Sequence, residues 1–417
     1  MGIAEEFRPL GAGFAEIYAF LKRARDEAPV FYWQEHDVWV VSRYDDVQKV
    51  LIDPVFSNEG NLGVMNNSYC PEAKAILAGG IDFMETPQVN ALEGEDHARV
   101  RKVMLNILTP KRFRSMEGSV RTMVTKLIDG FVQDGRCDFV TQFCYPLPVQ
   151  VIFDVIGFKV EEENLEQLQT WSDDMFRLWL TPMSPEDQVR CARHAVQFQR
   201  YMKEKMAERR RAPRDDLLSE FVRQLDSGEA KASEDEIVIM FPMNLIGAGH
   251  ETTKSALSNA MYQLLSQPSR WQDVVAHPET LSGVVDECLR IDSSVMAWYR
   301  TVAEDVELSG VRLEKGAKIV ALIGAANHDE RHFKDAESFC PVGRTERSGH
   351  LSFSIGRHFC LGAPLARMEM KIALEELAKR LPNLRMAPGQ SIEYDPAVAT
   401  RVIKHLQLEW DAPRALH

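Results

Sequence analysis

Cys360 is flanked by Gly356 and Gly362 and stands at the start of a predicted helix, residues 361–381. The N–H groups and the dipole at a helix N-terminus lower the pKa of a thiol, so we expect Cys360 to be held as a thiolate. Gly356 permits a tight, sharply bent backbone before the cysteine, and Gly362 lets the helix approach a flat ligand closely. Cys360 is therefore a candidate reactive residue, whereas the other cysteines of the seven are scattered and expected to be inert.

Residues 234–265 are predicted to form one very long helix, and Ser233 with Glu236 matches a capping box at its start. The middle of this helix contains residues that weaken helices, namely Pro242, Gly247, Gly249, Thr252 and Thr253. Weak residues at the centre of a long buried helix predict a local distortion beside a ligand. A tolerated notch for helix packing is the alternative.

Three segments come close to binding motifs for other ligands, namely a dinucleotide or a zinc ion, but none of them matches its motif. Residues 247–252 carry Thr where a dinucleotide-binding loop needs its last Gly, and they lie within a helix rather than after a strand. Residues 250–254 would match a zinc-protease helix only if Lys254 were His. A Cys₂His₂ zinc site could be formed, on ligand type alone, by Cys340, His350, His358 and Cys360. Their spacing, however, matches none of the usual pairs of zinc ligands.

The segment from Phe353 to Gly362 is the most specific motif in the chain, and its sequence is FSIGRHFCLG. It resembles the haem-binding signature of the cytochrome P450 family, F-x-x-G-x-H-x-C-x-G, a family in which a Cys thiolate holds the haem iron. The resemblance implies that Cys360 is the iron ligand. It also implies that Phe353, Gly356, His358 and Gly362 contact the haem b cofactor.

Residues 248–253, with the sequence AGHETT, are similar to the motif A/G-G-x-D/E-T-T in the long central helix of that family. The resemblance implies that Ala248 and Gly249 lie at the haem and leave space for dioxygen. It further implies that Glu251 and Thr252 form an acid–alcohol pair that delivers protons to the distal oxygen. By itself, a Thr-Thr pair in a helix usually reflects packing.

Two motifs with paired charges complete the resemblance. Glu287 and Arg290 match the family's E-x-x-R, and the i,i+3 spacing places both side chains on one helix face, where they can pair. In isolation such a motif is usually a surface ion pair. Residues 97–101 match the family's H-x-x-x-R. The resemblance implies that the haem propionates are contacted by His97, Arg101, Arg300 and His358.

The resemblance covers essentially the whole chain and is closest over residues 284–381. Ser354 departs from it, because Gly is common at that position. The meander 333–344 is one residue longer than usual, which leaves open whether Arg344 is a third partner of the E-x-x-R pair. Neither departure touches the expected iron ligand.

A hydrophobic content of 45% in 417 residues excludes a disordered protein. Helical spacing of apolar residues throughout 96–265 predicts a mainly α protein with a minor β portion. The resemblance implies one large helical domain, residues 1–417, around a buried haem. The β-rich portion is expected at about 28–60, 293–325 and 390–412. Within it, we predict a hairpin of 30–33 with 38–41, β-like runs at 306–311 and 319–323 joined through residues 314–316, and a strand at 402–410.

The net charge is −13, because 49 Lys and Arg residues face 62 Asp and Glu residues. This balance excludes a general nucleic-acid binder, which needs a broad basic surface. No apolar segment approaches the roughly 20 residues of a membrane-spanning helix, and the N-terminus lacks a secretory signal. We therefore predict a cytoplasmic, monomeric protein that does not bind membranes.

The sequence contains no flavin or iron–sulfur motif. The resemblance therefore implies that electrons from NAD(P)H arrive through a redox partner, either a ferredoxin with its reductase or a fused reductase domain. We hypothesise that a local basic face receives an acidic, ferredoxin-like partner, with scattered solvated charges as the alternative. This face would comprise Arg99, Lys102, Lys111, Arg112, Arg114, Arg357, Arg367 and Lys371.

The resemblance implies a monooxygenase that activates dioxygen and inserts one oxygen atom into a substrate by hydroxylation, epoxidation or O-dealkylation. The predicted pocket is mainly apolar, which favours a small or medium hydrophobic substrate. It would be lined by the loop 58–93, the helix 171–180, Asn244, Leu245, Ala248, Val295, Met296, Ala297 and Val398. The alternative is a haem-thiolate protein that uses peroxide, or only binds or rearranges its ligand. Glu251 and Thr252 favour the monooxygenase, because relatives of the second kind often lose that pair.

Overall fold

The computed structural model describes residues 2–59, 69–81, 86, 88–159, 163–180, 183–342 and 349–411. The chain forms two compact units. The first contains Met1–Ser57, Ser115–Pro148 and Glu251–His417, and the second contains Asn58–Arg114 and Val149–His250. The prediction of a single domain over residues 1–417 stays a prediction.

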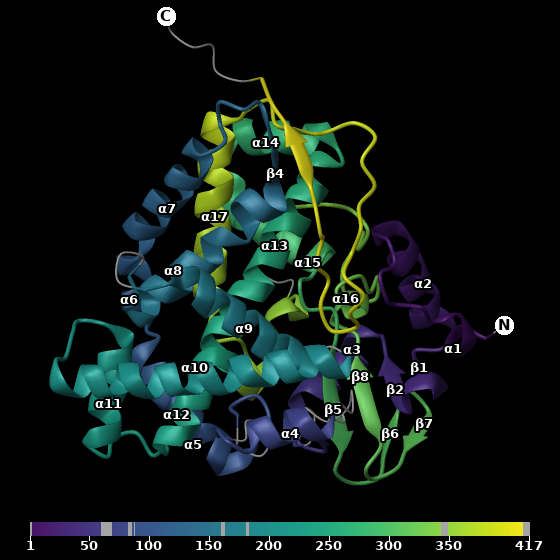
Figure 1. Ribbon diagram of the computed structural model, residues 1–417. Helices are drawn as coiled ribbons and strands as arrows, with labels where there is room; N and C mark the ends of the chain where they lie inside the picture. The colour runs from purple at the N-terminus through teal and green to yellow at the C-terminus, as the bar shows by residue number, and fades with distance from the viewer. Residues whose placement is uncertain are drawn as a thin grey trace, which may run out of the picture. The chain divides into compact units, whose positions relative to one another are not determined.

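The first unit combines helices with all of the described strands (Figure 1). Its helices are α1 (Ile3–Glu6), α2 (Phe14–Glu27), α3 (Tyr44–Ile52), α7 (Glu117–Asp129), most of α13 (Ala248–Leu265), α14 (Pro268–Ala276), α15 (Leu281–Ile291), α16 (Ile323–Ala326) and α17 (Ala363–Arg380). Short 3₁₀ turns lie at Gln34–His36, Pro278–Thr280, Leu351–Phe353 and Gly356–His358, and a π-helical turn at Val140–Cys144. α17 packs against α7 and α15 because its Leu, Ile, Met and Ala side chains are buried.

A five-stranded sheet lies beside α3 in this unit (Figure 1). Its strands, in spatial order, are β1 (Val30–Trp33), β2 (Val38–Val41), β8 (Lys318–Ala321), β5 (Trp298–Val302) and β3 (Phe56–Ser57). The β2–β8 pair is parallel and the other pairs are antiparallel. The predicted hairpin is confirmed, since Val30 pairs with Val41 and Trp33 with Val38. Asp37 closes the hairpin in a left-handed conformation, with φ 53°.

Two smaller sheets complete the first unit. One has the order β4 (Arg136–Asp138), β10 (Gln407–Glu409), β9 (Arg385–Met386), and the other pairs β6 (Val306–Leu308) with β7 (Val311–Leu313). The predicted β-like run at 306–311 is confirmed as β structure but divided into two strands, because Ser309 and Gly310 adopt positive φ values of 45° and 79° and turn the chain into a hairpin. Of the predicted strand at 402–410, only residues 407–409 form a strand, β10.

The second unit contains no strand among its described residues. Its helices are α4 (Pro71–Leu77), α5 (Gly94–Ile107), α6 (Pro110–Ser115), α8 (Pro146–Ile156), α9 (Leu165–Leu180), α10 (Pro185–Arg211), α11 (Leu217–Asp226) and α12 (Glu234–Met240). α10 packs against α4, α9 and α11. Together the two units confirm the predicted fold class, mainly α with a minor β portion. Much of the loop 58–93 lies outside the described residues, and α4 lies within the remainder.

The long helix predicted over 234–265 is interrupted. α12 is followed by a π-helical segment, η4 (Phe241–Gly247), and then by α13 (Ala248–Leu265). The Ala248 N–H donates to the Met243 carbonyl, five residues back. The capping box at the start of α12 is present, since the Ser233 side chain accepts from the Glu236 N–H at 3.1 Å and Glu236 accepts from the Ser233 N–H at 2.7 Å. The predicted local distortion is therefore confirmed as a π-helical segment.

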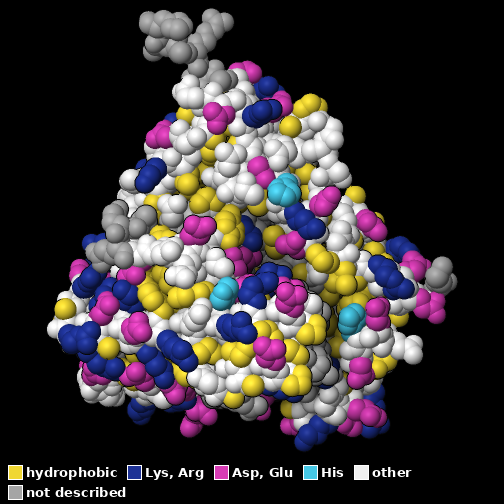
Figure 2. Space-filling view, in the orientation of Figure 1, with side chains coloured by type: hydrophobic (Ala, Val, Ile, Leu, Met, Phe, Trp, Pro, Cys, Tyr) yellow, Lys and Arg dark blue, Asp and Glu magenta, His cyan; other side chains and the backbone are white. Residues whose placement is uncertain are grey.

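The surface mixes both signs of charge. Figure 2 shows Lys and Arg side chains interspersed with Asp and Glu side chains on the face in view. Many of these charges are engaged in ion pairs; Arg223, for example, pairs with Glu220 and Glu229. Among the described residues, we find no helix with the length and apolar character needed to cross a membrane.

Candidate active site

The loop that carries Cys360, residues 353–362, is called the thiol loop below. The Cys360 N–H donates to the Phe353 carbonyl at 2.9 Å, and the Phe359 N–H donates to the Gly356 carbonyl at 3.1 Å. Gly356 has φ 71°, a left-handed conformation that glycine adopts without strain. These bonds fold the loop onto itself and leave Cys360 exposed.

α17 begins at Ala363 with Gly362 as its N-cap, two residues beyond Cys360. The sequence had placed Cys360 directly at the helix start; the structure places it in the turn that leads into the helix. A Cβ atom on Gly362 would lie 3.8 Å from Cys360 Sγ. A side chain at this position would therefore make van der Waals contact with the sulfur, which glycine avoids.

Ser354 is the unusual residue of the thiol loop. Its φ of 58° and ψ of −167° fall in a region that is essentially reserved for glycine. Its Oγ is buried and has no hydrogen-bond partner. The serine that replaces the family's common glycine thus holds a strained backbone.

The four residues expected at the haem propionates are distributed over both units. Arg300 lies on β5, is fully buried, and donates from Nη1 to the Tyr299 carbonyl at 2.7 Å. His358 is half-buried in the thiol loop. In the second unit, His97 is buried on α5 and Arg101 lies one turn further along the same helix. Buried cations are favourable only beside anions.

Cys360 and Arg300 fit haem b. Cys360 offers an exposed soft donor of the type that holds haem iron, and the glycine at position 362 places no side chain against its sulfur. The buried guanidinium of Arg300 is suited to an anionic carboxylate such as a haem propionate. Cys340, His350, His358 and Cys360 do not form a zinc site. Among the described residues, the side chains that lie close enough to share a metal ion do not include these four.

Glu251 and Thr252, the expected acid–alcohol pair, are both half-buried in the first turn of α13. The Glu251 carboxylate accepts from Lys254 Nζ at 2.7 and 2.9 Å, and that ammonium lies 5.3 Å from the ring centroid of Tyr145. Sequence reasoning missed Lys254, although its i,i+3 spacing from an acid was the available signal. The ammonium favours the ionised form of the carboxylate.

Ala248 and Gly249 follow the π-helical segment directly. A Cβ atom on Gly249 would lie 3.3 Å from Ile152 Cδ1 of α8. The glycine therefore lets α8 approach α13 closely. This packing role agrees with the notch that sequence reasoning held as the alternative, and it leaves the expected haem contact of Gly249 a prediction.

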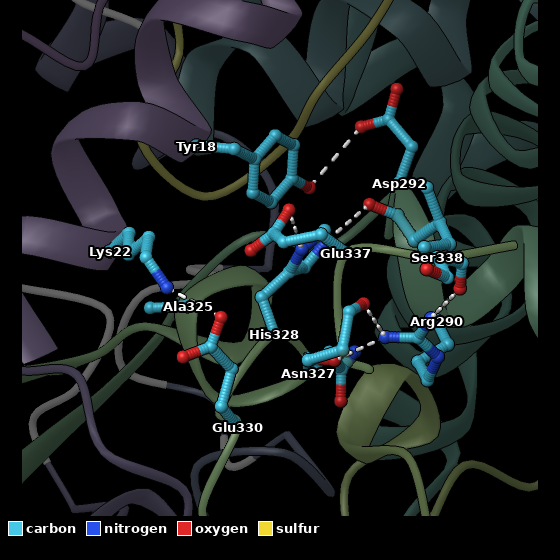
Figure 3. Close-up of polar contacts among 12 residues, drawn as sticks. Tyr18, Lys22, Arg290, Asp292, Ala325, Asn327, His328, Glu330, Glu337 and Ser338 are labelled. Atoms are coloured by element: carbon cyan, nitrogen blue, oxygen red, sulfur yellow. Dashed lines mark hydrogen bonds and ion pairs between the residues drawn. The ribbon is translucent and has the colours of Figure 1, made fainter. Parts of the chain in front are cut away.

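Glu287 and Arg290 form a buried, bidentate ion pair. Arg290 Nε and Nη2 each donate to a Glu287 carboxylate oxygen at 2.8 Å, and both side chains are 2% exposed or less. Figure 3 shows Arg290 reaching the chain beyond α16. Arg290 Nη1 donates to the carbonyls of Asn327 at 2.7 Å and Ala336 at 2.8 Å. The Cys340 N–H donates to Glu287 at 2.8 Å.

The Glu287–Arg290 pair therefore holds the meander that leads toward the thiol loop, mainly through backbone groups. Arg344, the possible third partner, lies outside the described residues.

Four of the predicted pocket residues come together in the first unit. Val295 forms a β-bridge with Thr400, and the Met296 N–H donates to the Ala399 carbonyl at 2.8 Å. Ala297 is fully buried. Met296 and Val398 line one cavity of about 20 Å³. In the second unit, Leu245 is buried and Asn244 Nδ2 donates to Asn90 Oδ1 at 3.4 Å.

Two members of the hypothesised basic face are already engaged. Arg99 pairs with Glu236 at 2.8 Å, and Arg367 pairs with Asp286 at 2.7 Å and lies 4.5 Å from the ring centroid of Phe353. Their charges are thus partly neutralised within the chain. Arg357 and Lys371 are exposed in the first unit, and Lys102 and Lys111 are exposed in the second.

The family model for cytochrome P450 matches residues 2–276 and 270–393. Cytochrome P450 monooxygenase PikC from Streptomyces venezuelae is 31% identical over 410 residues, which cover 96% of this chain and 93% of PikC. Mycinamicin IV hydroxylase/epoxidase from Micromonospora griseorubida is 31% identical over 378 residues and 90% of each chain. An intact type IV self-sufficient cytochrome P450 monooxygenase has a TM-score of 0.91 and 31% identity, covering 99% of this chain and 54% of that one.

These matches extend over nearly the whole chain and include the thiol loop. Members of the family are oxidoreductases that use haem, dioxygen and electrons from a redox partner. The chain therefore belongs to the cytochrome P450 family.

Proposed function

We propose that this chain is a monooxygenase that takes two electrons from a redox partner and inserts one oxygen atom into a small or medium hydrophobic substrate. The observation that carries the proposal is the thiol loop, which presents the exposed sulfur of Cys360 beside Gly362. The insertion would take the form of a hydroxylation, an epoxidation or an O-dealkylation. The name of one relative, a hydroxylase/epoxidase, supports the first two.

When bound, haem supplies the iron at which dioxygen is activated. The thiolate of Cys360 would hold the iron and donate electron density to it. His97, Arg101, Arg300 and His358 would bind the propionates. The main task of the protein is then to orient the substrate and to control water and protons near the iron.

Glu251 and Thr252 would move the protons that oxygen activation consumes. The Glu251 carboxylate pairs with Lys254, whose ammonium favours the ionised carboxylate, and an ionised carboxylate can accept a proton and pass it on. The Thr252 hydroxyl both donates and accepts hydrogen bonds, which suits it to relay a proton. Both groups lie in the first turn of α13, beyond the π-helical segment.

The test is Thr252→Ala, measured as product formed per reduced nicotinamide consumed. We expect haem binding to persist and this ratio to fall, because removal of one proton-delivery group typically slows transfer by about 10²-fold or more. Thr252→Ser, which keeps the hydroxyl, should retain most of the ratio. An unchanged ratio in Thr252→Ala would show that Thr252 does not deliver protons. Efficient turnover with peroxide alone would instead support the alternative of a peroxide-dependent protein.

The substrate class can be tested by a screen of small and medium hydrophobic compounds for a low-to-high-spin shift of the ferric protein. Displacement of water from the iron reports directly that a compound fits. The buried, apolar character of Met296, Ala297 and Val398 supports hydrophobic compounds. Hits confined to highly charged compounds would contradict this part of the proposal.

For the redox partner, we propose an acidic ferredoxin-like protein or a fused reductase domain, with NAD(P)H as the electron source. The fused arrangement is supported by the similarity to the self-sufficient monooxygenase. The present chain covers only 54% of that longer chain. Charge reversal in Arg112→Glu should slow transfer of the first electron, and the difference from wild type should shrink as salt is added. A rate that does not change would count against the basic face. The cytoplasmic location and the monomeric state stay predictions.

A further inference from the structure

Two adjacent carboxylates on α9 each contact a histidine on a different neighbouring segment. Asp174 accepts from His194 Nδ1 on α10 at 2.7 Å, and Asp173 contacts His250 Nε2 at 2.9 Å in the first turn of α13. All of these residues belong to the second unit. α9 is thus fastened by two Asp–His contacts, which differ in their surroundings.

The Asp174–His194 contact is supported by other cations. Arg190 Nε also donates to Asp174 at 3.3 Å, and Arg177 lies 3.7 Å away. Burial favours the neutral carboxyl group, but the hydrogen bonds from Arg190 and His194 outweigh it and hold the pKa of Asp174 below its usual range. His194 is about a quarter exposed, so water can replace its contact. Loss of this histidine would leave Asp174 with a partner.

The His250 ring is 1% exposed, and both of its nitrogens face acceptors. Nδ1 lies 2.8 Å from the carbonyl oxygen of Ile246, within the π-helical segment, and Nε2 lies 2.9 Å from Asp173 Oδ1. A neutral imidazole carries one N–H and can donate to only one of them. An ionised carboxylate and a carbonyl have no proton to give. Both contacts are therefore hydrogen bonds only if the ring carries two protons.

We propose that His250 is a positioning residue, held as an imidazolium between Asp173 and the Ile246 carbonyl, that fixes α9 onto the π-helical segment. The ring thereby places a hydrogen-bond donor on a backbone carbonyl of the π-helical segment. The charge on the ring ties the contact to pH.

The groups around the ring are consistent with this charge. Asp173 faces it from α9, and α8 presents the apolar Ile152 to the same turn of α13. Glu251, the next residue in the chain, pairs with Lys254, and one of its carboxylate oxygens lies within 4.8 Å of a His250 ring nitrogen, so a second carboxylate favours the charged ring. As pH rises and the second ring proton is lost, one of the two hydrogen bonds of His250 is lost with it.

The consequence for catalysis rests on the proposed function and on the predicted substrate pocket, which includes residues 171–180 of α9. Loss of the contact at high pH would loosen α9 and weaken substrate binding, seen as a rise in KM with little change in kcat. The physical claim about α9 does not need that function, because it can be measured without turnover.

The experiment is hydrogen–deuterium exchange of the peptide that covers α9, residues 165–180, in the purified haem-loaded protein. Protection factors, which correct for the intrinsic pH dependence of exchange, are compared between about pH 6 and pH 9. In wild type, protection should fall as pH rises. In His250→Phe it should be lower by about tenfold or more and independent of pH, because a charge-assisted hydrogen bond is lost.

Asp173→Asn separates charge from packing. The new amide can donate to Nε2 of a neutral ring while Nδ1–H donates to Ile246, so the contact survives without a charge. This variant should keep near wild-type protection, and its pH dependence should vanish. His194→Phe is the matched control on the other side of α9 and should lower protection less than about threefold, since Arg190 stays on Asp174.

Equal losses in His250→Phe and His194→Phe, or an unchanged pH dependence in Asp173→Asn, would overturn the proposal. If the exchange results hold but KM does not follow pH, then the imidazolium contact stands and the assignment of α9 to the substrate pocket fails.

Discussion

The thiol loop and the interrupted helix α12–η4–α13 hold their predicted functional residues by different means. The thiol loop is closed by backbone hydrogen bonds, Cys360 N–H to the Phe353 carbonyl among them, and by positive φ angles at Ser354 and Gly356. The interrupted helix is held by charged side chains, such as Lys254 on Glu251 and the Asp173–His250 contact.

The difference follows from what each region has to do. A metal ligand needs a fixed sulfur position, and backbone bonds provide one that does not change with pH. Groups that move protons must change charge, so their surroundings consist of titratable partners that respond to protonation. The first region should therefore tolerate pH change and fail when its anchors are cut, whereas the second should respond to pH.

The largest effect is expected from cutting the anchor of the meander that leads to the thiol loop. Glu287→Gln leaves Arg290 buried without its anion, which typically destabilises a protein by about 3–5 kcal/mol. The midpoint of urea denaturation of the haem-loaded protein measures this. Glu330→Gln, at an exposed pair with Lys22, is the matched control and should change little. A small loss in Glu287→Gln would show that the meander does not depend on the pair.

The region of the thiol loop is expected to tolerate pH change, but the helix that follows it, α17, contains one group that should make stability depend on pH. Burial raises the pKa of Glu369 on α17 to about 8, whereas its ordinary value is 4.5. Between these values the folded protein keeps a proton that the unfolded chain releases, so stability falls as pH rises, by on the order of 1 kcal/mol per pH unit. In Glu369→Gln, denaturation midpoints from about pH 5 to pH 8 should lose this slope. A slope that persists in the variant would assign it to other groups.

A smaller loss is expected at the start of the interrupted helix. Ser233→Ala removes the N-cap that satisfies the Glu236 N–H, at about 1 kcal/mol. Ser282→Ala, at an exposed position within α15, has no cap to lose and should leave the denaturation midpoint near that of wild type. Equal midpoints for the two variants would mean that the cap contributes nothing.

An effect of similar size but opposite sign is expected in the thiol loop. Ser354→Gly relieves the strained φ of 58° and removes a buried hydroxyl that has no partner. We expect stability to rise by about 1 kcal/mol, measured as an upward shift of the denaturation midpoint. A loss would show that the serine makes a contribution beyond its backbone conformation.

The thiol loop could be recognised from sequence because its geometry depends on local residues. Gly356 and the cysteine four residues later lie within one short motif, and the turn they form needs no distant partner. The capping box at Ser233 and the hairpin of β1 with β2 were predictable for the same reason. Helix interruption was predictable as a distortion, from Pro242 and the weak helix formers near it, though its π-helical form was not.

What sequence reasoning missed depends on distant or irregular contacts. The Asp173–His250 contact joins residues 77 positions apart, and no local pattern indicates it. β4 is three residues long and exists only through pairing with β10, far along the chain. The burial of the Glu287–Arg290 pair was likewise hidden, because its partners are backbone groups of the meander.

The central claim is that the thiolate of Cys360 holds the haem iron, and the most direct test is the absorption spectrum of the reduced, carbon monoxide-bound protein. The account predicts the red-shifted Soret band of a thiolate-ligated haem in wild type and its absence in Cys360→Ser. Persistence of that band in Cys360→Ser would contradict the account.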